Sequence, residues 1–356
     1  MPDIADLSKG IGISKDQLSA DGEPCILYGE LYTKYKSETI KEVISKTNID
    51  NTKLVKSKAN DVIIPCSGET AEEIATARCV LKDDILLGGD LNIIRLHGYD
   101  GSFMSYQLNG KRKYDIAKVA QGVSVVHLYG EHLKNIKTIN PSLNEQKKIA
   151  NLLSLLDERI STQNKIIEDL KKLKSAISER LFKDAKGDVI TLSEICDIVK
   201  GEQINGELLS EHGKYYVMNG GTDPSGYYDN YNVGAYTISI SEGGNSCGYV
   251  QFNKCPFWCG GHCYSIQNIA DNINNLYLYH YLKTEEKAIM KLRIGSGLPN
   301  IQKKDLATFK IKLPTSKQQK AISDILSLLE QKAEIEEQIL IAMQDEKQYL
   351  LRQMFI

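Results

Sequence analysis

One stretch of the chain has the residue types of a metal site. Cysteines stand at positions 255, 259 and 263 with a histidine at 262, and Cys247 lies upstream. Thiolates and imidazoles are ligands that zinc prefers. The spacing is CxxxC rather than the usual CxxC, however, and no second cluster accompanies it. We therefore expect a turn with packed, reduced thiols and no bound metal.

Motifs for common catalytic chemistries are missing from the sequence. There is no Gly-x4-Gly-Lys-Ser/Thr pattern for binding nucleotide phosphates and no Gly-x-Ser-x-Gly nucleophile turn. There is also no Asn/Asp-Pro-Pro-aromatic tetrapeptide, because the segment Asn140-Pro141-Ser142 lacks the aromatic residue that would stack on a target base. The sequence therefore predicts a chain that is not an enzyme and holds no cofactor of its own.

Lysines and polar side chains gather in a few segments with the chemistry of DNA contacts. Lysine and arginine neutralise phosphates, whereas amide, hydroxyl and guanidinium groups read base edges. Each single lysine is more often a solvated surface charge, so the prediction depends on the clusters. The candidate DNA-binding residues are Lys34, Lys36, Lys56, Lys58, Lys111, Arg112, Lys113, Ser124, Asn219, Thr222, Tyr227, Asn245, Ser296, Asn300, Lys303 and Lys304.

These candidates belong to a chain that repeats itself. The segment from Pro141 to Asp157 recurs 173 positions later, from Pro314 to Glu330, and the same offset pairs Gly122 with Gly295. Near the start of each half the offset is 191, which pairs Asp6 with Asp197, Lys9 with Lys200 and Gly10 with Gly201. Ends that match around middles that diverge indicate one scaffold that carries two different variable surfaces.

The two repeated segments begin long amphipathic stretches. Apolar residues recur at spacings of three and four over residues 144–183 and 316–353, with no internal proline or glycine. Each stretch predicts a helix of about 60 Å at 1.5 Å per residue. A small domain cannot bury so long a stripe, so we expect the two helices to pack antiparallel as a loose coiled coil; helices folded separately onto their own halves are the alternative.

The remaining segments predict mixed α/β domains. Short β-type runs such as Val62-Ile63-Ile64 and Tyr236–Ile240 alternate with glycine-rich turns, and the clearest helical stretch covers residues 274–292. The expected fold class is α+β with an internal pseudo-two-fold repeat. The expected domains are a first α/β domain at 1–140, a long helix at 141–187, a second α/β domain at 188–313 and a second long helix at 314–356.

Composition agrees with an ordinary globular protein. The 356 residues are 42% hydrophobic and 25% charged, which fits two domains, and the formal net charge is −2. Near-neutrality means that contacts with DNA must come from local patches. No run of about 18 apolar residues and no secretory leader pattern occurs, so we expect a cytoplasmic chain without a membrane partner.

The repeated helix starts, the duplication and the length together resemble the specificity (S) subunits of type I restriction–modification systems. The resemblance depends on Pro141, Glu145-Gln146, Ile149-Ala150, Leu152 and Asp157, and on their second copies at Pro314, Gln318-Gln319, Ile322, Leu326 and Glu330. It covers the whole chain, in the order variable domain, helix, variable domain, helix. Residues 219–227 and 295–301 also look like target-recognition sequence.

The resemblance implies a function. Each variable domain would read a short half-site of double-stranded DNA, and the helices would separate the domains and dock two methyltransferase (M) subunits. The candidate partner-binding residues are Glu145, Gln146, Gln318 and Gln319. S-adenosylmethionine, ATP and magnesium would belong to the M subunits and to restriction (R) subunits. Two other hypotheses are a fused enzyme fragment, which would need the missing motifs, and a coiled-coil scaffold with two heads that bind carbohydrate or peptide.

Overall fold

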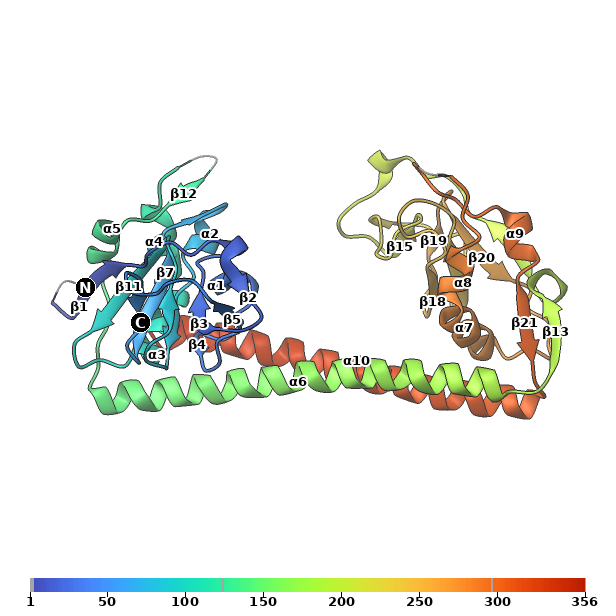
Figure 1. The fold of residues 1–356 in the computed structure, drawn as a ribbon. Coiled ribbons are helices and arrows are strands. Elements are labelled where there is room, and N and C mark those ends of the chain that lie inside the picture. The colour runs from blue at the N-terminus through green and yellow to red at the C-terminus, as the bar shows by residue number, and fades with distance from the viewer. Residues whose placement is uncertain (1–2, 123–124, 296, 356) are drawn as a thin grey trace. The chain divides into compact units, whose positions relative to one another are not determined.

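The chain divides into two units that each combine a mixed α/β domain with parts of two long helices. The structure is a computed structural model that describes residues 3–122, 125–295 and 297–355. Unit 1 comprises residues 1–165 and 337–356, and unit 2 comprises residues 166–336. The predicted boundaries treated the helices as separate domains, whereas contacts group each α/β domain with the helix segments beside it (Figure 1).

Unit 1 is built on two five-stranded sheets with orders β1-β11-β7-β9-β4 and β2-β5-β3-β10-β6, and a small pair β12-β8. Its strands are β1 (Ala5–Lys9), β2 (Leu18–Ser19), β3 (Glu23–Ile26), β4 (Thr39–Ile40), β5 (Ser45–Thr47), β6 (Val55–Lys56), β7 (Asp61–Pro65), β8 (Ser67–Gly68), β9 (Arg78–Val80), β10 (Leu86–Leu87), β11 (Leu91–Leu96) and β12 (Val126–His127). Its helices are α1 (Glu30–Thr33), α2 (Ala71–Ile74), α3 (Gly101–Asn109), α4 (Lys113–Val119), α5 (Gly130–Lys134), residues 143–165 of α6 (Leu143–Asp184) and residues 337–353 of α10 (Ser316–Gln353).

Unit 2 contains a four-stranded sheet β14-β20-β17-β18, a three-stranded sheet β16-β15-β19 and the pair β13-β21. Its strands are β13 (Asp188–Thr191), β14 (Asp197–Lys200), β15 (Tyr215–Met218), β16 (Tyr227–Tyr228), β17 (Thr237–Ser241), β18 (Val250–Asn253), β19 (Trp258–Cys259), β20 (Cys263–Gln267) and β21 (Lys310–Leu313). Its helices are α7 (Asn275–Thr284), α8 (Glu286–Met290), α9 (Lys303–Ala307), residues 166–184 of α6 and residues 316–336 of α10 (Ser316–Gln353). The predicted helix over residues 274–292 is therefore two helices, which meet at Glu285.

The sequence repeat is visible in the strand pairing. In unit 1, β1 pairs antiparallel with β11 and β3 pairs parallel with β10; in unit 2, β14 pairs antiparallel with β20 and β15 pairs parallel with β19. After β1 and β14 the chain passes so close to its neighbour that only glycine fits. A Cβ on Gly10 would lie 2.0 Å from the carbonyl oxygen of Gly88, and one on Gly201 would lie 2.2 Å from that of Gly260.

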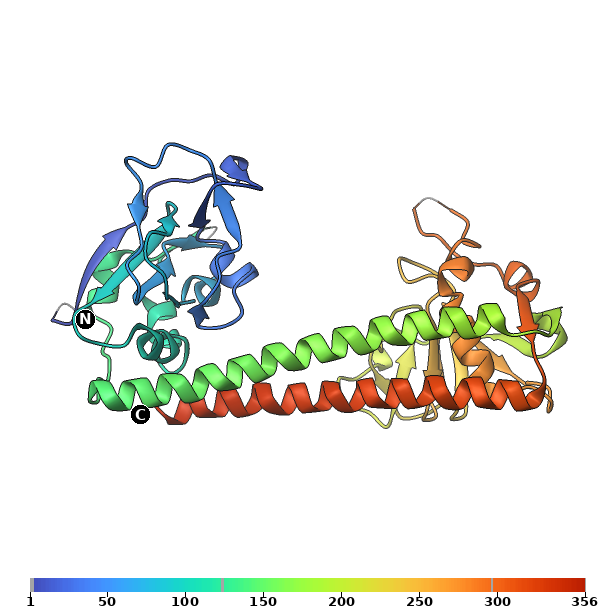
Figure 2. The same ribbon diagram turned by 60° about the horizontal axis from the view of Figure 1, so that its bottom comes forward.

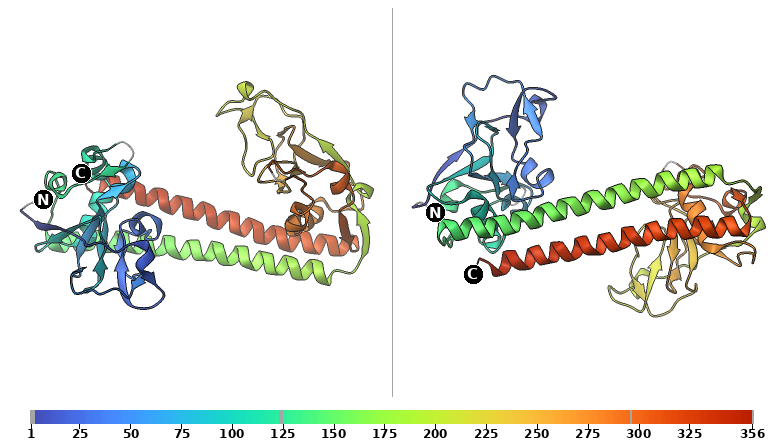
Figure 3. Two further views of the ribbon diagram at one scale, coloured as in Figure 1. Left: turned by 45° about the horizontal axis from the view of Figure 1, so that its top comes forward. Right: turned by 90° about the horizontal axis from the view of Figure 1, so that it is seen from below.

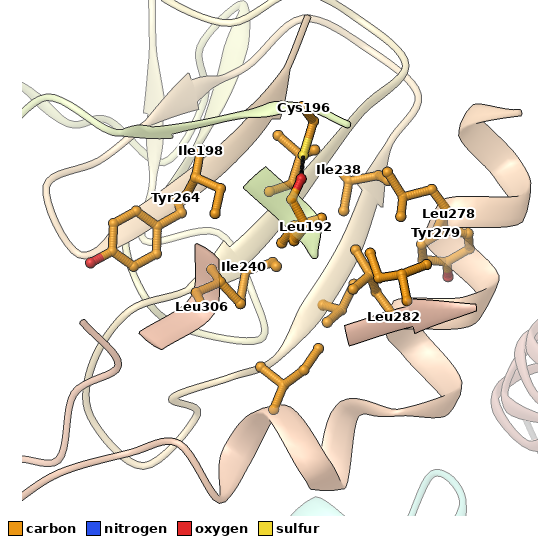
Figure 4. Close-up of a cluster of buried hydrophobic side chains, with 14 of the residues drawn as sticks. Leu192, Cys196, Ile198, Ile238, Ile240, Tyr264, Leu278, Tyr279, Leu282 and Leu306 are labelled. Atoms are coloured by element: carbon orange, nitrogen blue, oxygen red, sulfur yellow. Dashed lines mark hydrogen bonds between the residues drawn. The ribbon is translucent and has the colours of Figure 1, made fainter. Parts of the chain in front are cut away.

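The core of each unit joins its sheet to a helix. In unit 2, Leu278 and Leu282 of α7 pack on Ile238 and Ile240 of β17 in one buried cluster, as Figure 4 shows. In unit 1 the same role falls to α3, whose Met104 and Leu108 pack in the cluster that includes β7 and β11 residues. Burying apolar side chains in this way stabilises each unit by about 25 cal/mol per Å² of area removed from water.

The opposite face of each of these helices contacts the long helices. In unit 1, Phe103 of α3 packs with Leu153 of α6 and Leu351 of α10. In unit 2, Tyr277 of α7 packs with Phe182 of α6 and with residues of α10. The segments of α6 and α10 in each unit run antiparallel, side by side in the views of Figures 2 and 3. Helices α6 and α10 thus confirm the two predicted helical stretches.

Among the described residues, none of the helices combines the length and the apolar character that crossing a membrane requires.

Candidate nucleic-acid interface

Each unit presents a short hairpin built on the same frame. In unit 1, Gln121 and His127 exchange two backbone hydrogen bonds of 2.9 and 2.7 Å, and in unit 2 Ile294 and Asn300 do so at 2.8 and 3.0 Å. The two pairs are related by the offset of 173. The glycine after the first member, Gly122 or Gly295, has a positive φ of 129° or 105°, a conformation that L side chains rarely adopt.

A second loop supports each hairpin from one side. In unit 1, His127 pairs with Ser67 of β8, and in unit 2 Asn300 forms a bridge with Gly243. The residue after each hairpin is tied down as well, since the amide of Leu128 donates to the carbonyl of Cys66 and that of Ile301 donates to the carbonyl of Glu242. The frame is therefore held by backbone bonds, which leaves the side chains of the hairpins free to differ.

The hairpin side chains do differ between the units. Val125 is 50% exposed in unit 1, and Leu298 at the equivalent position is 87% exposed in unit 2. Valine and leucine are usually buried, so neither side chain serves a core here. Two predicted DNA-binding residues, Ser124 and Ser296, lie outside the described residues. Asn300 is exposed within the second hairpin, and Lys303 and Lys304 open α9 directly after it.

The structure brings several other predicted residues of unit 2 to the same place. The loop that contains Asn219 and Thr222 is tied to the end of β17, because the Ser241 hydroxyl donates to the Gly220 carbonyl over 2.6 Å. Gly243, two residues later, bridges Asn300 of the second hairpin. Asn245 follows Gly244, whose amide donates to the carbonyl of Pro299 in the hairpin. The Asn219 side chain, however, accepts a bond from the His262 amide at 3.1 Å, so its oxygen has a structural partner.

Tyr227 begins the strand that follows the loop of Asn219 and Thr222. It belongs to β16, where its amide and carbonyl both bond to Ser210, and its side chain is 37% exposed. An exposed ring of this kind can stack on a base. Its strand pairs with β15, so Tyr227 lies at the end of the β15–β16 connection that contains Asn219 and Thr222.

In unit 1 the predicted lysines are spread over three places. Lys34 and Lys36 border a groove that is also lined by α6 and α10 residues, and Lys34 is paired with Glu30 at 2.6 Å. Lys56 lies in β6, 3.9 Å from Glu23, and Lys58 is exposed just after this strand.

The third cluster, Lys111-Arg112-Lys113, lies beside the end of α10. A Cβ on Gly110 would approach the Leu351 carbonyl to 2.7 Å, which fixes this loop against the helix. The Arg112 guanidinium is 3.4 Å from Asp115. The structure therefore does not join these basic residues to the first hairpin, and their contact with DNA remains a prediction.

Sequence reasoning missed an aromatic and basic cluster beside the first hairpin. The rings of His127 and Tyr129 stack with centroids 6.1 Å apart, and His132 meets the Tyr129 ring edge-on at 5.5 Å. The Lys9 ammonium lies 5.5 Å from the centroid of the same ring, which is 46% exposed. Such a cluster can stack on a base and attract a phosphate. The signal was available, since the offset of 173 pairs His127 with Asn300.

The cysteine-rich stretch is mostly interior. Cys247, Cys259 and Cys263 are buried and Cys255 is exposed. The Cys247 thiol donates to the Glu242 carbonyl at 2.9 Å, and burial raises its pKa. Within residues 3–122, 125–295 and 297–355, no group of three or more His, Cys, Asp or Glu side chains is arranged to hold a metal ion.

Two of the four predicted partner-binding residues are buried and two are exposed. Gln146 is 1% exposed and Gln319 is 3% exposed, so these side chains are interior rather than part of a docking surface. The adjacent Glu145 and Gln318 are exposed and cap their helices. Glu145 accepts bonds from the amide and hydroxyl of Ser142, which lower the pKa of its carboxyl. Partner contact by Glu145 and Gln318 remains a prediction.

Apolar side chains are exposed along both long helices. Leu152 and Leu155 of α6 are 50% and 59% exposed, and at the offset of 173 Ile325 and Leu328 of α10 are 44% and 66% exposed. We call these two sets the first and second apolar helix faces. Leu152 belongs to the apolar repeat of residues 144–183, but α10 covers the face of Ala150 and Leu153 instead.

Comparisons with known proteins identify the family. Residues 2–172 and 186–344 match the family described as type I restriction modification DNA specificity domain. A putative type I specificity subunit of Mycoplasma genitalium is 34% identical over 147 residues, which is 40% of this chain and 38% of that protein. A type I restriction enzyme specificity subunit of Methanocaldococcus jannaschii is 26% identical over 93% of this chain and 86% of its own length. The chain thus matches about two fifths of the length of the first of these relatives.

A solved structure has the same fold. The S subunit of a type I restriction–modification system from M. genitalium superimposes with a TM-score of 0.72 at 22% identity, over 99% of this chain and 94% of that one. The two α/β domains, the long helices and the twofold match of the family agree with the predicted fold class, and the expectation of a specificity subunit rather than a catalytic one agrees with the same findings. This chain belongs to the type I restriction–modification DNA specificity family.

Proposed function

We propose that this chain reads a bipartite target in double-stranded DNA, with one half-site for each unit. The observation that carries the proposal is the repeated hairpin, which has the same backbone frame in both units and different side chains at its exposed positions. A constant frame with variable side chains is what two readers of different short sequences require, because base edges are discriminated by the identity of the side chain.

The side chains near the hairpins have suitable chemistry. Asn300 offers an amide for bidentate contact with adenine, and Lys303 and Lys304 offer charges for phosphates. In unit 1, Tyr129 and His127 offer stacked rings beside Lys9. A chain that acts on cellular DNA in this way would work in the cytoplasm.

The two apolar helix faces would dock two methyltransferase subunits. Exposed apolar patches commonly mark interaction surfaces. Leu152 and Leu155 stand at the same repeat positions as Ile325 and Leu328, so one kind of partner can recognise both faces. S-adenosylmethionine would be bound by these partners, and ATP and magnesium would be used by restriction subunits that join the complex.

The experiment that tests the reading function is selection of bound duplexes from random DNA by the assembled complex. His127→Ala and Asn300→Ala form a matched pair, because the repeat places them at equivalent positions of the two hairpins. Each variant is expected to change base preference in one half-site only, and the other half-site is the internal control. Failure of the unsubstituted complex to enrich any bipartite sequence, or a change in both half-sites with either variant, would contradict the proposal.

A further inference from the structure

A buried lysine of α10 is held by two carboxylates in unit 1. The Lys347 ammonium lies 2.6 Å from an oxygen of Asp157 on α6 and 2.6 Å from an oxygen of Glu38 in the α/β domain. All three side chains are at most 10% exposed. The Tyr106 hydroxyl donates to Asp157 at 2.8 Å and the Ser37 hydroxyl does so at 2.7 Å. One cluster therefore joins α6, α10 and the α/β domain.

Unit 2 has the same pair at the equivalent positions. Lys174 of α6 lies 3.1 Å from Glu330 of α10, and these residues are related to Lys347 and Asp157 by the offset of 173. The Tyr279 hydroxyl donates to Glu330 at 2.9 Å, as Tyr106 does to Asp157. The helices have exchanged roles, since the lysine is on α6 in unit 2 and on α10 in unit 1. Because the ion pair and its tyrosine recur at equivalent positions of both units, we do not regard the arrangement as accidental.

Net stabilisation does not account for such a pair. Removing two charges from water costs about as much as their attraction returns, so a buried ion pair adds little to stability compared with apolar residues of the same volume. A polar group in a helix–helix seam does have a well-attested effect on register, because every misaligned arrangement leaves it buried without a partner. Apolar contacts discriminate registers poorly, since one leucine can replace another across a seam.

The neighbouring sequence makes a misaligned arrangement costly in unit 1. If the helices slipped by seven residues, which preserves the apolar stripe, Lys347 would face Ala150 or Asn164 in place of Asp157. Neither of these residues carries a negative charge. The same slip would also carry Lys347 away from Glu38, leaving two carboxylates of the cluster unpaired.

We propose that Lys347, through Asp157 and Glu38, is a positioning residue that selects one register of α6 and α10 and thereby sets the gap between the two DNA half-sites. The selection of register follows from the contacts in unit 1 alone. The consequence for the gap rests on the proposed function, in which the helices act as the spacer between two reading domains.

Disulfide trapping in the full chain measures register without DNA or a partner. In a Cys255→Ser background, Ile160→Cys with Gln344→Cys reports the native register, because both positions line one groove beside Asp157 and Lys347. Ile160→Cys with Glu337→Cys reports a slip of seven residues. Native trapping is expected to exceed shifted trapping by at least about tenfold. Lys347→Met is expected to raise the shifted product, whereas Lys320→Met, which removes an exposed lysine paired within its own helix, is not.

A fully neutral cluster separates register from stability. The variant Glu38→Gln/Asp157→Asn/Lys347→Met leaves no charge within the trio. The buried Arg78 beside it keeps its bonds to the Tyr35 and Ala77 carbonyls. The variant is therefore expected to stay folded while losing the preference for native trapping. In the assembled complex, the same variant is expected to select targets with a broader distribution of gaps and unchanged half-site bases.

The outcomes are distinct. If the neutral variant folds and still traps only the native pair, the register proposal is overturned. If trapping shifts but the gap distribution stays sharp, the link between register and gap is overturned. If the unsubstituted complex selects no bipartite target while trapping behaves as expected, the proposed function fails and the register selection stands.

Discussion

Gln319 holds the start of α10 against its α/β domain with the same two hydrogen bonds that Gln146 uses at the start of α6. The Gln146 amide donates to the Pro141 carbonyl at 2.7 Å and its oxygen accepts from the Asp100 amide at 2.9 Å. The Gln319 amide donates to the Pro314 carbonyl at 3.0 Å, and its oxygen accepts from the Asn274 amide at 2.9 Å. Asp100 and Asn274 cap α3 and α7, so each glutamine joins two helix starts.

The first prediction is that Gln146→Ala and Gln319→Ala each loosen their own unit. Either change leaves a buried amide and a buried carbonyl without a partner, which costs about 1–3 kcal/mol. Hydrogen exchange should rise at the start of α3 in the first variant and at the start of α7 in the second. Glu145→Ala and Gln318→Ala, which change the exposed neighbours, should have the smaller effect. Equal exchange changes in both units from one substitution would show that the glutamines do not act locally.

The glutamines illustrate what the sequence could and could not reveal. The duplication, the helix bounds and the α/β character followed from repeats and periodicity. Gln146 is predicted together with Glu145 to bind a partner, which requires an exposed side chain, but it is buried. Its spacing from Ala150 and Leu153, four and seven residues, already placed it on the buried face. That signal was present and was outweighed by the polarity of the side chain.

Other features could not be predicted because they depend on long-range pairing. The contact of Lys347 with Glu38 joins residues 309 positions apart, and no local pattern reports it. The exposure of Leu152 depends on how far α10 covers α6, which periodicity leaves open. The separation of Lys111–Lys113 from the first hairpin likewise follows from the approach of Gly110 to Leu351 and from no property of the lysines themselves.

The second prediction concerns the apolar helix faces. Leu155→Asp should abolish docking at the first face and Leu328→Asp at the second, because a desolvated carboxylate in an apolar interface is strongly unfavourable. Each single variant should bind one methyltransferase subunit, the double variant none and the unsubstituted chain two, as measured by light scattering at saturating partner. Both positions are exposed, so folding should be retained. If the double variant still bound two subunits, the apolar helix faces would not be the docking sites.

The third prediction is a pH dependence of unit 2. His280 lies within α7, where its ring contacts the Ser327 hydroxyl at 2.9 Å, and burial lowers its pKa from 6.5 to about 4. Facing groups are Glu330, 4.0 Å away, and Lys174. Between these two pKa values the unfolded state binds a proton that the folded state does not, so stability falls as pH drops from 6.5 towards 4.

The size of this loss is at most about 3.4 kcal/mol, from 1.36 kcal/mol per pKa unit and the difference between 6.5 and about 4. His280→Gln keeps a side chain that can bond to Ser327 and cannot titrate, so its stability should depend less on pH over that window. Burial raises the pKa of the Glu330 carboxyl, but Lys174 and Tyr279 lower it by more, so the stability that this carboxylate contributes is lost only below about pH 4.5. Hydrogen exchange of α7 between pH 4.5 and 7 measures the difference. If the exchange rates of α7 depended on pH equally in the unsubstituted protein and in His280→Gln, His280 would not be the cause of the pH dependence.

The fourth prediction tests the helices as the spacer. Both α6 and α10 pass from one unit to the other, α6 at residues 165–166 and α10 at residues 336–337. Inserting seven residues into each helix at these points keeps the contacts within both units and the phase of the apolar stripe. The helices would lengthen by about 10 Å, which is about three base pairs of duplex at 3.4 Å each. Selected targets should therefore have a gap longer by about that amount, with both half-site sequences unchanged.

A matched insertion of seven residues in α6 alone is the control, because it breaks the pairing of Lys347 or of Lys174 with its partner and should lower binding without defining a new gap. If the double insertion returned the original gap, the length of the helices would not determine the spacing, and the separation of the half-sites would have to come from the methyltransferase partners instead.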